Sequence, residues 1–472
     1  MRFLVLISVF VLSCMTSGAA TYYVSSSTGS DYNSGTSSSA PRKTLAGLSS
    51  RMKNGNTILL KRGDIFFESL NGFTDCTISD YGSGAKPMLC GFIIQKDNSS
   101  WVESSAGVWS LDLNTASNFY GHATNSKVNT YGNIGCLYDP DTDMIVGNLV
   151  SSSSLLKNEG DFYTSNIWLK AEVTSSTYSK LYLKSASRPK AYCLASGEIG
   201  VSEMTNCKIS NIAVVGFGCH GMNYLYNCTI TDCDIDIIGG SIMVGQNSSW
   251  ARYGNGIELW ISSQPCNGNL ITGCQISRVY DAAVTIQGNA KGGVNPSGNR
   301  ITNNRIAWCR QGFEQWTTTD GQPVIFEDCC FSDNVLFNCG NNMFSGTPTH
   351  TTDVTFLCYK YPAASLPIEN NLVYASNYRY SQYNETGIRN NEVYVVAGSC
   401  LYYYYRSDEA SFTISADSSV QTTLYRKYTG DNSSIKIVQK GSVEDQTADT
   451  RVSNALNYMR VAPLWTTIKQ YN

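Results

Sequence analysis

"NCTIT", residues 227–231, recurs along the chain as a small polar residue, then Cys or Asn, then any residue, then an apolar one. The other copies are "NCKIS" from Asn206, "GCQIS" from Gly273, "NNRIA" from Asn303, "DCCFS" from Asp328, "NNLVY" from Asn370 and "NNEVY" from Asn390. They are spaced roughly 21 to 30 residues apart, with two longer gaps where loops must bulge out. A strand-rich repeat of this length is typical of a solenoid, in which each repeat contacts only its neighbours.

The repeat predicts two inward columns of side chains. The first is the apolar residue of each copy: Ile209, Ile230, Ile276, Ile306, Phe331, Val373 and Val393. The second follows three residues later: Ile212, Cys233, Val279, Cys309, Asn334, Ser376 and Val396. A single coil cannot bury its apolar side alone, whereas stacked coils share one core. The pattern therefore indicates an all-β chain built from the coils of a parallel β-helix.

Asn and Cys at the repeated position fit the turns of such coils. Asn tolerates the left-handed backbone of a tight bend, and its amide can bond to the equivalent amide of the next coil. The chain has 17 cysteines, a number that in an exported protein first suggests disulfides. Because Cys233 and Cys309 fall in an inward column, we expect them to be small buried hydrophobic residues instead.

Three stretches near the start carry a resemblance to a known group. They are "TYYVSSSTGSDYNSGTSSSAPRKTLAGL" from Thr21, "NGNTILLKRGDIFFESL" from Asn54 and "ISDYGSGAKPMLCG" from Ile78. They resemble the opening of exported right-handed parallel β-helix proteins of the pectate-lyase-like superfamily. The resemblance implies a right-handed parallel β-helix whose opening is an N-terminal cap with the first coils. That superfamily holds lyases, glycoside hydrolases, esterases, epimerases and phage adhesins, so the resemblance implies no particular activity.

The expected organisation has five parts. Residues 1–20 have the basic start, apolar run and small residues of a signal peptide; a lipid-bearing Cys14 is the alternative. Residues 21–125 are the N-terminal cap and first coils, and 126–195 break the repeat and read as an inserted antiparallel β-unit. Residues 196–400 are the main coils. Residues 401–472 are C-terminal strands and a cap, with a short amphipathic tail near "RVSNALNYMR" and few helix signals elsewhere.

The amino-acid composition limits the classes of molecule that the chain can bind. The formal net charge is −3 and 15% of residues are charged, which argues against nucleic acid because phosphate binding requires a basic patch. Thirty Tyr and eight Trp suit a protein that offers flat surfaces to sugars, and equally a large β-protein with no ligand. No later segment is long and apolar enough to span a membrane. We expect a monomer that is secreted, periplasmic or at the cell surface.

Three five-residue stretches align to form a candidate site: "GIELW" 256–260, "AVTIQ" 283–287 and "GFEQW" 312–316. In this alignment Ile257, Val284 and Phe313 point inward. Glu258, Thr285 and Glu314 then stack on the outer surface, and Trp260, Gln287 and Trp316 form a second outward column.

Two carboxylates two coils apart are the residues that glycoside hydrolysis requires. Neighbouring strands lie about 4.8 Å apart, so the two Glu backbones are expected roughly 10 Å apart. That is within reach of the carboxyl separation of about 6.5–9.5 Å in inverting glycosidases. We predict Glu258, Glu314 and the nearby Asp281 as catalytic acids. The predicted substrate-binding residues are Trp260, Trp316, Tyr280, Gln287, Thr285, Arg278 and Arg310.

Other interpretations stay open. Outward Glu is ordinary on a β-helix, and stacked Trp residues can lie under a loop. A polysaccharide lyase acting on a uronic-acid polymer through arginine or tyrosine is the second hypothesis, and a non-catalytic glycan-binding or surface protein is the third. His220 reads as a turn residue. No cofactor or metal site is predicted, although the alternating Asp232, Asp234 and Asp236 could hold calcium as well as form a solvated strand face.

Overall fold

The computed structural model describes residues 18–121, 133–164, 180–243, 252–262, 266–290, 294–319, 324–340, 343–346, 353–359, 366–375, 379–382, 387–404 and 412–455. The signal peptide predicted at the start therefore falls outside the described residues up to position 17, and so does Cys14. The described helices include none that is long and apolar enough to cross a membrane.

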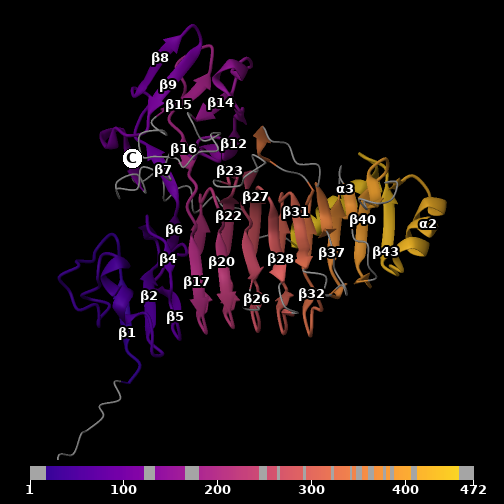
Figure 1. Cartoon of the computed structure of the whole chain (residues 1–472), viewed down its shortest axis with the longest axis horizontal. Coiled ribbons are helices and arrows are strands. Elements are labelled where there is room, and N and C mark those ends of the chain that lie inside the picture. Colours follow the sequence, from indigo (N-terminus) through magenta and orange to yellow (C-terminus); the bar gives the residue numbers. More distant parts are fainter. Residues whose placement is uncertain are drawn as a thin grey trace, which may run out of the picture.

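Three sheets, each ten-stranded within the described residues, run the length of the molecule (Figure 1). Sheet one contains β1 (Thr21–Val24), β2 (Thr57–Lys61), β5 (Thr77–Tyr81), β18 (Lys208–Ser210), β21 (Thr229–Thr231), β26 (Leu270–Thr272), β29 (Arg300–Thr302), β32 (Cys330–Ser332), β36 (Ile368–Glu369) and β39 (Ile388–Arg389).

Sheet two contains β3 (Ile65–Phe66), β6 (Met88–Cys90), β19 (Ala213–Val215), β22 (Asp234–Ile238), β27 (Gln275–Val279), β30 (Arg305–Ala307), β33 (Val335–Phe337), β37 (Leu372–Ala375), β40 (Glu392–Val396) and β43 (Ser434–Val438). Sheet three contains β4 (Leu70–Asn71), β17 (Val201–Thr205), β20 (Met222–Tyr226), β25 (Ile257–Ile261), β28 (Ala282–Ala290), β31 (Gln311–Thr319), β35 (Val354–Tyr359), β38 (Arg379–Gln382), β41 (Cys400–Tyr404) and β42 (Phe412–Ser415).

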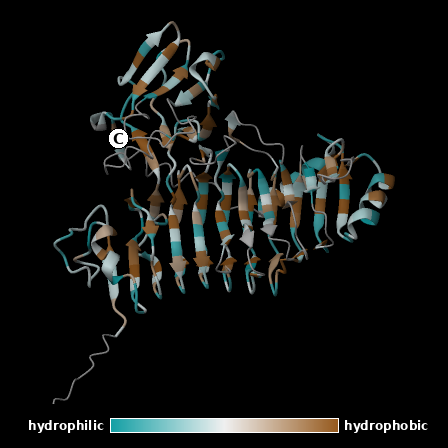
Figure 2. Cartoon of the chain, in the orientation of Figure 1, coloured by the Kyte–Doolittle hydropathy of each residue, from teal (hydrophilic) through white to brown (hydrophobic). Residues whose placement is uncertain are grey.

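The chain visits the three sheets in turn, one strand per coil in each, so the fold is the predicted right-handed parallel β-helix. Neighbouring coils pair in parallel, and the antiparallel pair β41–β42 closes sheet three. Figure 2 shows apolar and polar residues interleaved along the strands. The apolar residues of all three sheets converge on one buried core along the axis.

The core is built from columns of equivalent residues, but the column predicted first mixes two sheets. Ile209, Ile230 and Phe331 belong to sheet one, where Ile209 pairs with Ile230. Ile276 and Ile306 belong to sheet two and pair with each other. The predicted column was wrong because the motif occurs twice in each coil, once before each of two strands that are separated by a tight turn.

The turn between sheets one and two uses the left-handed backbone that was predicted for Asn. It holds Asn211, Asp232, Asn303, Asp333, Asn370 and Asn390 at positive φ, with Gly273 in the equivalent place. The residue that follows this position points inward, and from Asn304 onward it is an asparagine ladder. The side-chain amide of Asn304 donates to Asn334 at 3.0 Å, Asn334 to Asn371 at 3.1 Å and Asn371 to Asn391 at 2.9 Å. These bonds satisfy buried amides and lock the register of adjacent coils.

The cysteines behave as predicted for Cys233 and Cys309, which are both buried and free. All of the cysteines among the described residues are free, so no disulfide joins that part of the chain. The column that contains the asparagine ladder begins with Cys233 and Cys274, which shows that the two residue types are alternatives at one inward turn position.

The inserted β-unit stands over the N-terminal half of the helix (Figure 1). Its mostly antiparallel strands are β7 (Phe92–Gln95), β8 (Trp101–Ser105), β9 (Val108–Asp112), β10 (Phe119–Gly121), β11 (Cys136–Asp139), β12 (Met144–Val146), β13 (Asn148–Leu149), β14 (Asp161–Thr164), β15 (Lys180–Lys184), β16 (Cys193–Ala195) and the distant β34 (Ser345–Gly346). The unit starts at β7 rather than at the predicted residue 126, since β7 pairs with β10 and β16 instead of with the next coil.

Two arginines fasten this unit to the helix. Arg278 forms ion pairs with Asp236 of β22 and with Asp143, which lies beside β12. Arg252, in the small sheet of β23 (Ser241–Ile242) and β24 (Arg252–Tyr253), donates to the carbonyls of Gly240, Gly135 and Ser345. Both guanidinium groups are buried, so they serve packing between the two parts of the molecule.

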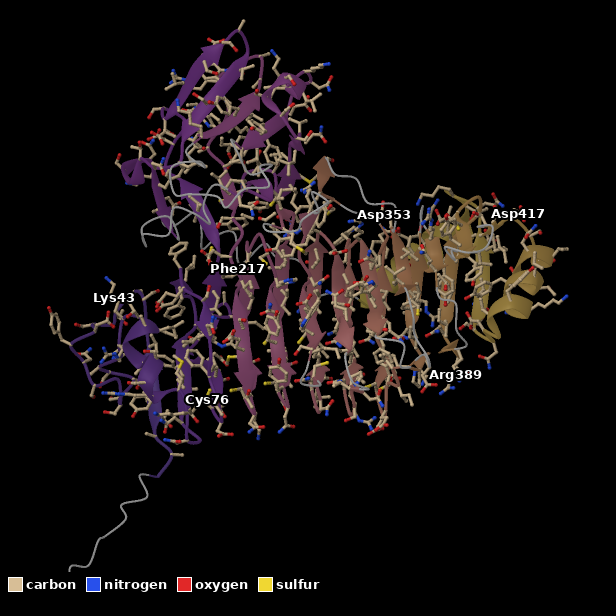
Figure 3. All side chains as sticks on the ribbon, in the orientation of Figure 1. Lys43, Cys76, Phe217, Asp353, Arg389 and Asp417 are labelled. Carbon is tan, nitrogen blue, oxygen red and sulfur yellow. The ribbon has the colours of Figure 1, made fainter. Side chains whose placement is uncertain are left out.

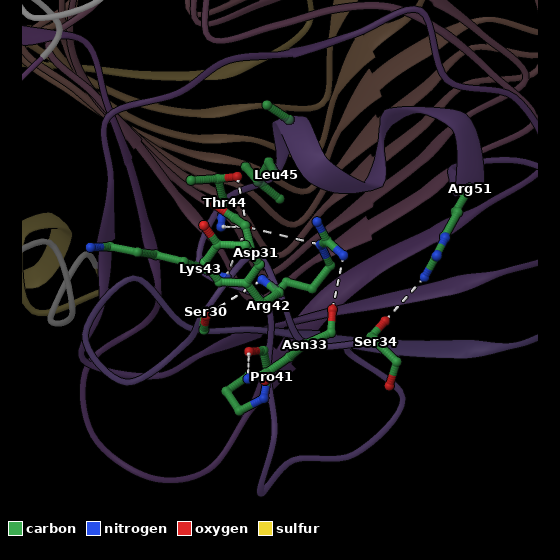
Figure 4. A network of polar contacts seen from close by, with 12 residues as sticks. Ser30, Asp31, Asn33, Ser34, Pro41, Arg42, Lys43, Thr44, Leu45 and Arg51 are labelled. Atoms are coloured by element: carbon green, nitrogen blue, oxygen red, sulfur yellow. Dashed lines mark hydrogen bonds and ion pairs between the residues drawn. The ribbon is translucent and has the colours of Figure 1, made fainter.

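The N-terminal cap is an irregular loop region that closes with the 3₁₀ helix η1 (Ala46–Arg51). Figure 4 shows its polar network, in which the Asp31 carboxylate accepts bonds from the backbone and hydroxyl of Thr44 at 3.0 Å each. Arg42 donates to the Asn33 carbonyl at 2.9 Å and Arg51 to that of Ser34 at 3.0 Å. These bonds hold a segment that has no preceding coil to pair with. Further short 3₁₀ turns are η2 (Ala116–Asn118) and η4 (Ser153–Leu155).

The C-terminal cap contains two helices, α2 (Ser419–Thr429) and α3 (Val443–Ala455), in a part of the chain predicted to hold strands and a short amphipathic tail. The Ser418 hydroxyl accepts from the backbone of Gln421, and Gly430 is left-handed at the end of α2. Ser-x-x-Gln and a terminal Gly are the helix signals in this stretch of sequence. The predicted tail near "RVSNALNYMR" overlaps the end of α3, and its last residues lie outside the described range.

Candidate active site

The predicted alignment of the three site strands is confirmed. In sheet three Glu258 pairs with Thr285, and Thr285 pairs with Glu314. Trp260, Gln287 and Trp316 are paired in the same way, two residues further on. Two strand spacings separate the backbones of the two Glu residues, which corresponds to about 10 Å.

The outward direction of the two Glu side chains predicted an open surface, but both carboxyl groups are buried. Glu258 is 4% exposed and Glu314 is 9% exposed, and Thr285 between them is buried. The sequence could not reveal this because the covering groups, among them His220 and Tyr253, come from the connections that lead into β20 and β25. Carboxyl groups held away from water in this way interact more strongly with each other and with nearby charges.

The two tryptophans remain half-buried beside this buried row. Their ring centroids are 6.3 Å apart and their planes are tilted by 33°. Aromatic rings at this separation form one apolar surface, and the apolar face of a sugar ring can stack on such a surface.

Glu258 is surrounded by hydrogen-bond donors. Its Oε2 accepts from the Asn255 amide at 3.1 Å and from the Gln287 amide. Its Oε1 lies 3.7 Å from Nε2 of His220, beyond a direct hydrogen bond but within reach of an electrostatic contact. These donors hold the Glu258 carboxyl in one orientation.

His220, predicted as a turn residue, does lie in the turn between β19 and β20, but its imidazole is buried in the site. The backbone N–H of Asn255 donates to Nδ1 at 3.1 Å, and the ring packs edge-on against Tyr253 at 5.3 Å. Burial alone would lower the pKa of His220, whereas the nearby Glu258, Cys219 and Asp281 raise it to about 9. The Asn255 N–H opposes this shift, because a proton on Nδ1 would remove the lone pair that accepts its bond.

Glu314 lies in the opposite kind of environment. Burial, followed by the charge of Asp281, raises the pKa of Glu314 to about 8. Burial also raises the pKa of Asp281 itself, against the opposing charges of Arg310 and His220. Asp281 lies in the turn before β28, and its charge acts on Glu314.

Three of the predicted substrate-binding residues are covered by protein. Arg278 is engaged beneath the inserted unit by Asp236 and Asp143, on sheet two rather than beside the Glu row. Tyr280 is 1% exposed, packed edge-on against Phe344 and between the guanidinium groups of Arg252 and Arg310. Arg310 is buried as well and pairs with Asp353 at 3.0 Å; Figure 3 labels Asp353 at the edge of the coils that faces the inserted unit. These side chains support the site from beneath and do not present a surface to substrate.

Several residues near the Glu row were missed from sequence: His220, Asn223, Tyr253 and Asn255. Asn223 pairs with Glu258 in the sheet, so continuing the strand alignment one coil toward the N-terminus would have found it. Asn255 stands three residues before Glu258 in the quoted stretch. His220 comes from a turn and Tyr253 from the short strand β24 outside the repeating coils, and no periodicity predicts their side-chain directions.

Two of the three aspartates proposed as calcium ligands are engaged in ion pairs. Asp234 forms an ion pair with Lys86 at 2.7 Å, and Asp236 pairs with Arg278. Asp232 occupies the left-handed turn position before them. Across the described ranges no group of three or more His, Cys, Asp or Glu side chains is placed to hold a metal ion.

Comparisons with known proteins give distant similarities only. No family model matches the chain, and no curated protein matches it by sequence. Among solved structures, the complex of XylC with xylose has a TM-score of 0.38 at 12% identity, covering 88% of this chain and 82% of that one. The GH136 lacto-N-biosidase from Eubacterium ramulus has a TM-score of 0.34 at 12% identity, with 82% and 67% covered. The Dettilon tailspike protein has a TM-score of 0.29 at 10% identity, with 76% and 50% covered. At such TM-scores these similarities say nothing of the activity.

Proposed function

We propose that the chain is a glycoside hydrolase that acts on a polysaccharide, with Glu314 as general acid and Glu258 as general base. The observation that carries this proposal is the contrast between two carboxyls in register on strands two apart. Glu314 has a pKa raised to about 8 by burial and by Asp281, whereas Glu258 accepts hydrogen bonds from two amides. Pairs of carboxyls whose environments differ in this way are typical of acid/base sites in glycosidases.

In the proposed reaction one carboxyl group donates a proton and the other accepts one. Glu314 donates its proton to the leaving glycosidic oxygen as that bond breaks. Glu258 takes a proton from the water that attacks the anomeric carbon, so one water is consumed and one new reducing end is formed. The backbone spacing of about 10 Å leaves room for this water between substrate and base, and favours inversion at the anomeric carbon over a covalent intermediate. Trp260 and Trp316 stack on the sugar rings beside the bond.

The lyase alternative has less support in the described residues. A lyase on a uronic-acid polymer needs a cation to neutralise the uronate and a base to remove the neighbouring proton. Arg278 and Arg310, which were predicted to bind substrate, are buried in ion pairs with aspartates. No specific observation favours the lyase, and a non-catalytic glycan-binding protein becomes an outcome of the test below.

Family membership and location are part of the same proposal. We infer from the β-helix and from the opening quoted above that the chain belongs to the pectate-lyase-like superfamily. Residues 1–20 support export as a secreted, periplasmic or cell-surface monomer.

The test is the product profile of residues 21–472 on a panel of plant, algal and animal polysaccharides, beside Glu258→Gln and Glu314→Gln. We expect new reducing ends without the ultraviolet absorbance of unsaturated products, and at least a hundredfold loss in both variants. Glu444→Gln, on α3 at the far cap, removes the same charge away from the site and keeps full activity. Unsaturated products, or activity that survives in both site variants, would overturn the proposal. Binding without turnover would show that the chain is a non-catalytic glycan-binding protein whose Trp pair binds the sugar.

A further inference from the structure

Three charged residues form a row just before three neighbouring strands of sheet three. Asp281, Arg310 and Asp353 directly precede β28, β31 and β35, and the pairing of these strands places them at equivalent positions of successive coils. The backbone N–H of Gln311 donates to the Asp281 carbonyl at 3.2 Å. That of Val354 donates to the Arg310 carbonyl at 3.1 Å. The row therefore holds one guanidinium between two carboxyls, with about 4.8 Å from strand to strand.

The guanidinium in the middle of this row is only partly engaged. Arg310 is 1% exposed, its Nε donates to Asp353 at 3.0 Å, and it lies over the Tyr280 ring at 5.3 Å. Its Nη1 is buried and has no hydrogen-bond partner among the described residues. A buried guanidinium is costly unless acidic groups compensate its charge. Asp353 is partly exposed to water and bonds to one nitrogen, so the remaining compensation comes from other acids of the site.

The site acids on which Arg310 acts are Asp281 and Glu314. Burial raises the pKa of Asp281, and the charges of Arg310 and then of His220 oppose this rise. Burial and then the charge of Asp281 raise the pKa of Glu314 to about 8, and the charge of Arg310 opposes that rise as well. The strongest charge acting on Asp281 is therefore Arg310, and the strongest charge acting on Glu314 is Asp281.

Other ionisable groups around the row complete the balance of charge. Among the described residues they are Glu258, His220, Tyr280, Arg252 and Arg379. Arg252 shares the Tyr280 ring with Arg310, and Arg379 acts on Asp353 at the outer end of the row. Of the described arginines, Arg310 is the one whose charge acts on both Asp281 and Glu314.

We propose that Arg310 is a positioning residue that acts through Asp281: its buried guanidinium keeps Asp281 ionised, and the ionised Asp281 keeps the proton on Glu314. The inference rests on the proposed function and deepens it by naming the group that keeps the general acid loaded. When Glu314 gives its proton to the leaving oxygen, two neighbouring carboxylates repel each other, and the charge of Arg310 offsets that repulsion. Glu258 then releases its proton to water and Glu314 takes one back, so the protons balance.

The test follows the protons of Asp281 and Glu314 without turnover. Infrared difference spectra of the carboxyl C=O stretch are recorded across neutral pH, with Asp281→Asn and Glu314→Gln to assign the two signals. We expect the wild type to hold one proton on this pair at neutral pH. Arg310→Met should hold two and release both at higher pH, because loss of a nearby cation disfavours both carboxylates. Arg310→Lys keeps the charge and should stay closer to the wild type.

Asp353→Asn is the matched variant with the opposite expectation. It removes an anion from the same row and leaves the cation in place, so the pair should release its protons at lower pH. General damage to the row would move Arg310→Met and Asp353→Asn in the same direction, whereas the proposed role moves them in opposite directions. Glu444→Gln on α3 should leave the titration unchanged.

A second readout uses the polysaccharide that the wild type hydrolyses. Arg310→Met should lose kcat at least about tenfold with KM changed less than about twofold, because the anion left on Glu314 is less stabilised. The basic limb of its kcat profile should move to higher pH, and Arg310→Lys should recover part of both effects. A merely structural role would lower activity without moving that limb.

An unchanged titration in Arg310→Met, or a shift to higher pH in Asp353→Asn, would overturn the inference. If Arg310→Met does not fold, Asp353→Asn decides alone: a shift to lower pH supports the role, and any other result rejects it. The proposed function fails separately. Titrations that move as expected in a protein that hydrolyses no polysaccharide would reject the hydrolase and keep the charge relation. Hydrolysis that requires both Glu residues, with titrations that do not move, would do the reverse.

Discussion

Glu258 and Glu314 are the same residue type at equivalent positions of two coils, yet their surroundings suit them to opposite tasks. Amide donors hold Glu258, while burial and the neighbouring Asp281 raise the pKa of Glu314 to about 8. Two turn residues contribute to the difference, Asn255 before β25 and Asp281 before β28, together with Gln287 on β28 and the burial of Glu314. At the scale of the residue, the assignment of acid and base depends on these surroundings and not on the positions in the strands, which are equivalent.

The raised pKa of Glu314 predicts a pH-dependent stability that does not require activity. Its usual value is 4.5 and its folded value is about 8, so the stability linked to its proton is fully present below the unfolded pKa. That stability is lost as pH rises toward 8. Between pH 5 and pH 8 the wild-type Tm should therefore fall more than the Tm of Glu314→Gln. Differential scanning fluorimetry at both pH values checks this, with Glu444→Gln expected to follow the wild type; parallel curves for all three proteins would contradict it.

Two substitutions separate the two contacts of His220. His220→Asn places an amide oxygen near the position of Nδ1 and can still accept from Asn255, but it loses the nitrogen that faces Glu258. His220→Phe keeps the packing on Tyr253 and loses both. Leaving the buried Asn255 N–H without an acceptor should cost His220→Phe about 1–3 kcal/mol relative to His220→Asn in urea unfolding. Both variants should lose kcat more than KM if the Nε2 contact orients Glu258. Equal stability of the two variants would show that Asn255 does not depend on the ring.

At the scale of the element, each coil is held in register by the turn between sheets one and two. A left-handed residue lets the chain bend within a few residues, and the next residue places an amide or a thiol into the interior column. In the asparagine ladder successive amides bond from one coil to the next, which fixes how β32 stacks on β29 and β36 on β32. One coil earlier the backbone N–H of Cys274 donates to Asn304, so the same column also holds the coil of Glu258 in register with the coils of Thr285 and Glu314.

Asn334→Ala should break the ladder at its middle. It leaves the Asn304 backbone and side-chain donors without the oxygen to which both now bond. We expect a loss of about 2–3 kcal/mol in the free energy of unfolding, measured in urea. Asn98→Ala, at an exposed turn of the inserted unit, should change stability by less than about 0.5 kcal/mol. A loss at Asn334 no larger than that at Asn98 would mean that the ladder adds no stability.

At the scale of the whole molecule, one core extends along the axis, and caps at both ends protect coils that lack a neighbour. The inserted unit is fastened by buried arginines, so the Tyr280 and Arg310 cluster beneath the site depends on both parts. Stability rests on this continuous packing and on hydrogen-bonded columns. Most of the cysteines of the described residues contribute as buried thiols.

Reductant should therefore leave thermal unfolding unchanged. The described cysteines form no disulfide, so a reductant breaks no cross-link and removes no constraint on the unfolded chain. Melting curves with and without a phosphine reductant are expected to coincide, and thiol titration of the denatured, unreduced protein should find the cysteines of the mature chain free. A lower Tm in reductant would show that disulfides form in solution.

The sequence by itself determined the β-helix, the turn chemistry and the pairing of Glu258 with Glu314, because these follow from local repetition: strands have a period of two, and coils repeat at nearly constant length. It misassigned the apolar column, since the same motif occurs twice in each coil, and it placed the inserted unit too late in the chain. Only the tertiary structure decided that the Glu row is covered, that Arg278, Arg310 and Tyr280 are occupied, and that His220 joins the site. Those contacts depend on how turns and an inserted unit fold back over a sheet, and no periodic pattern encodes that.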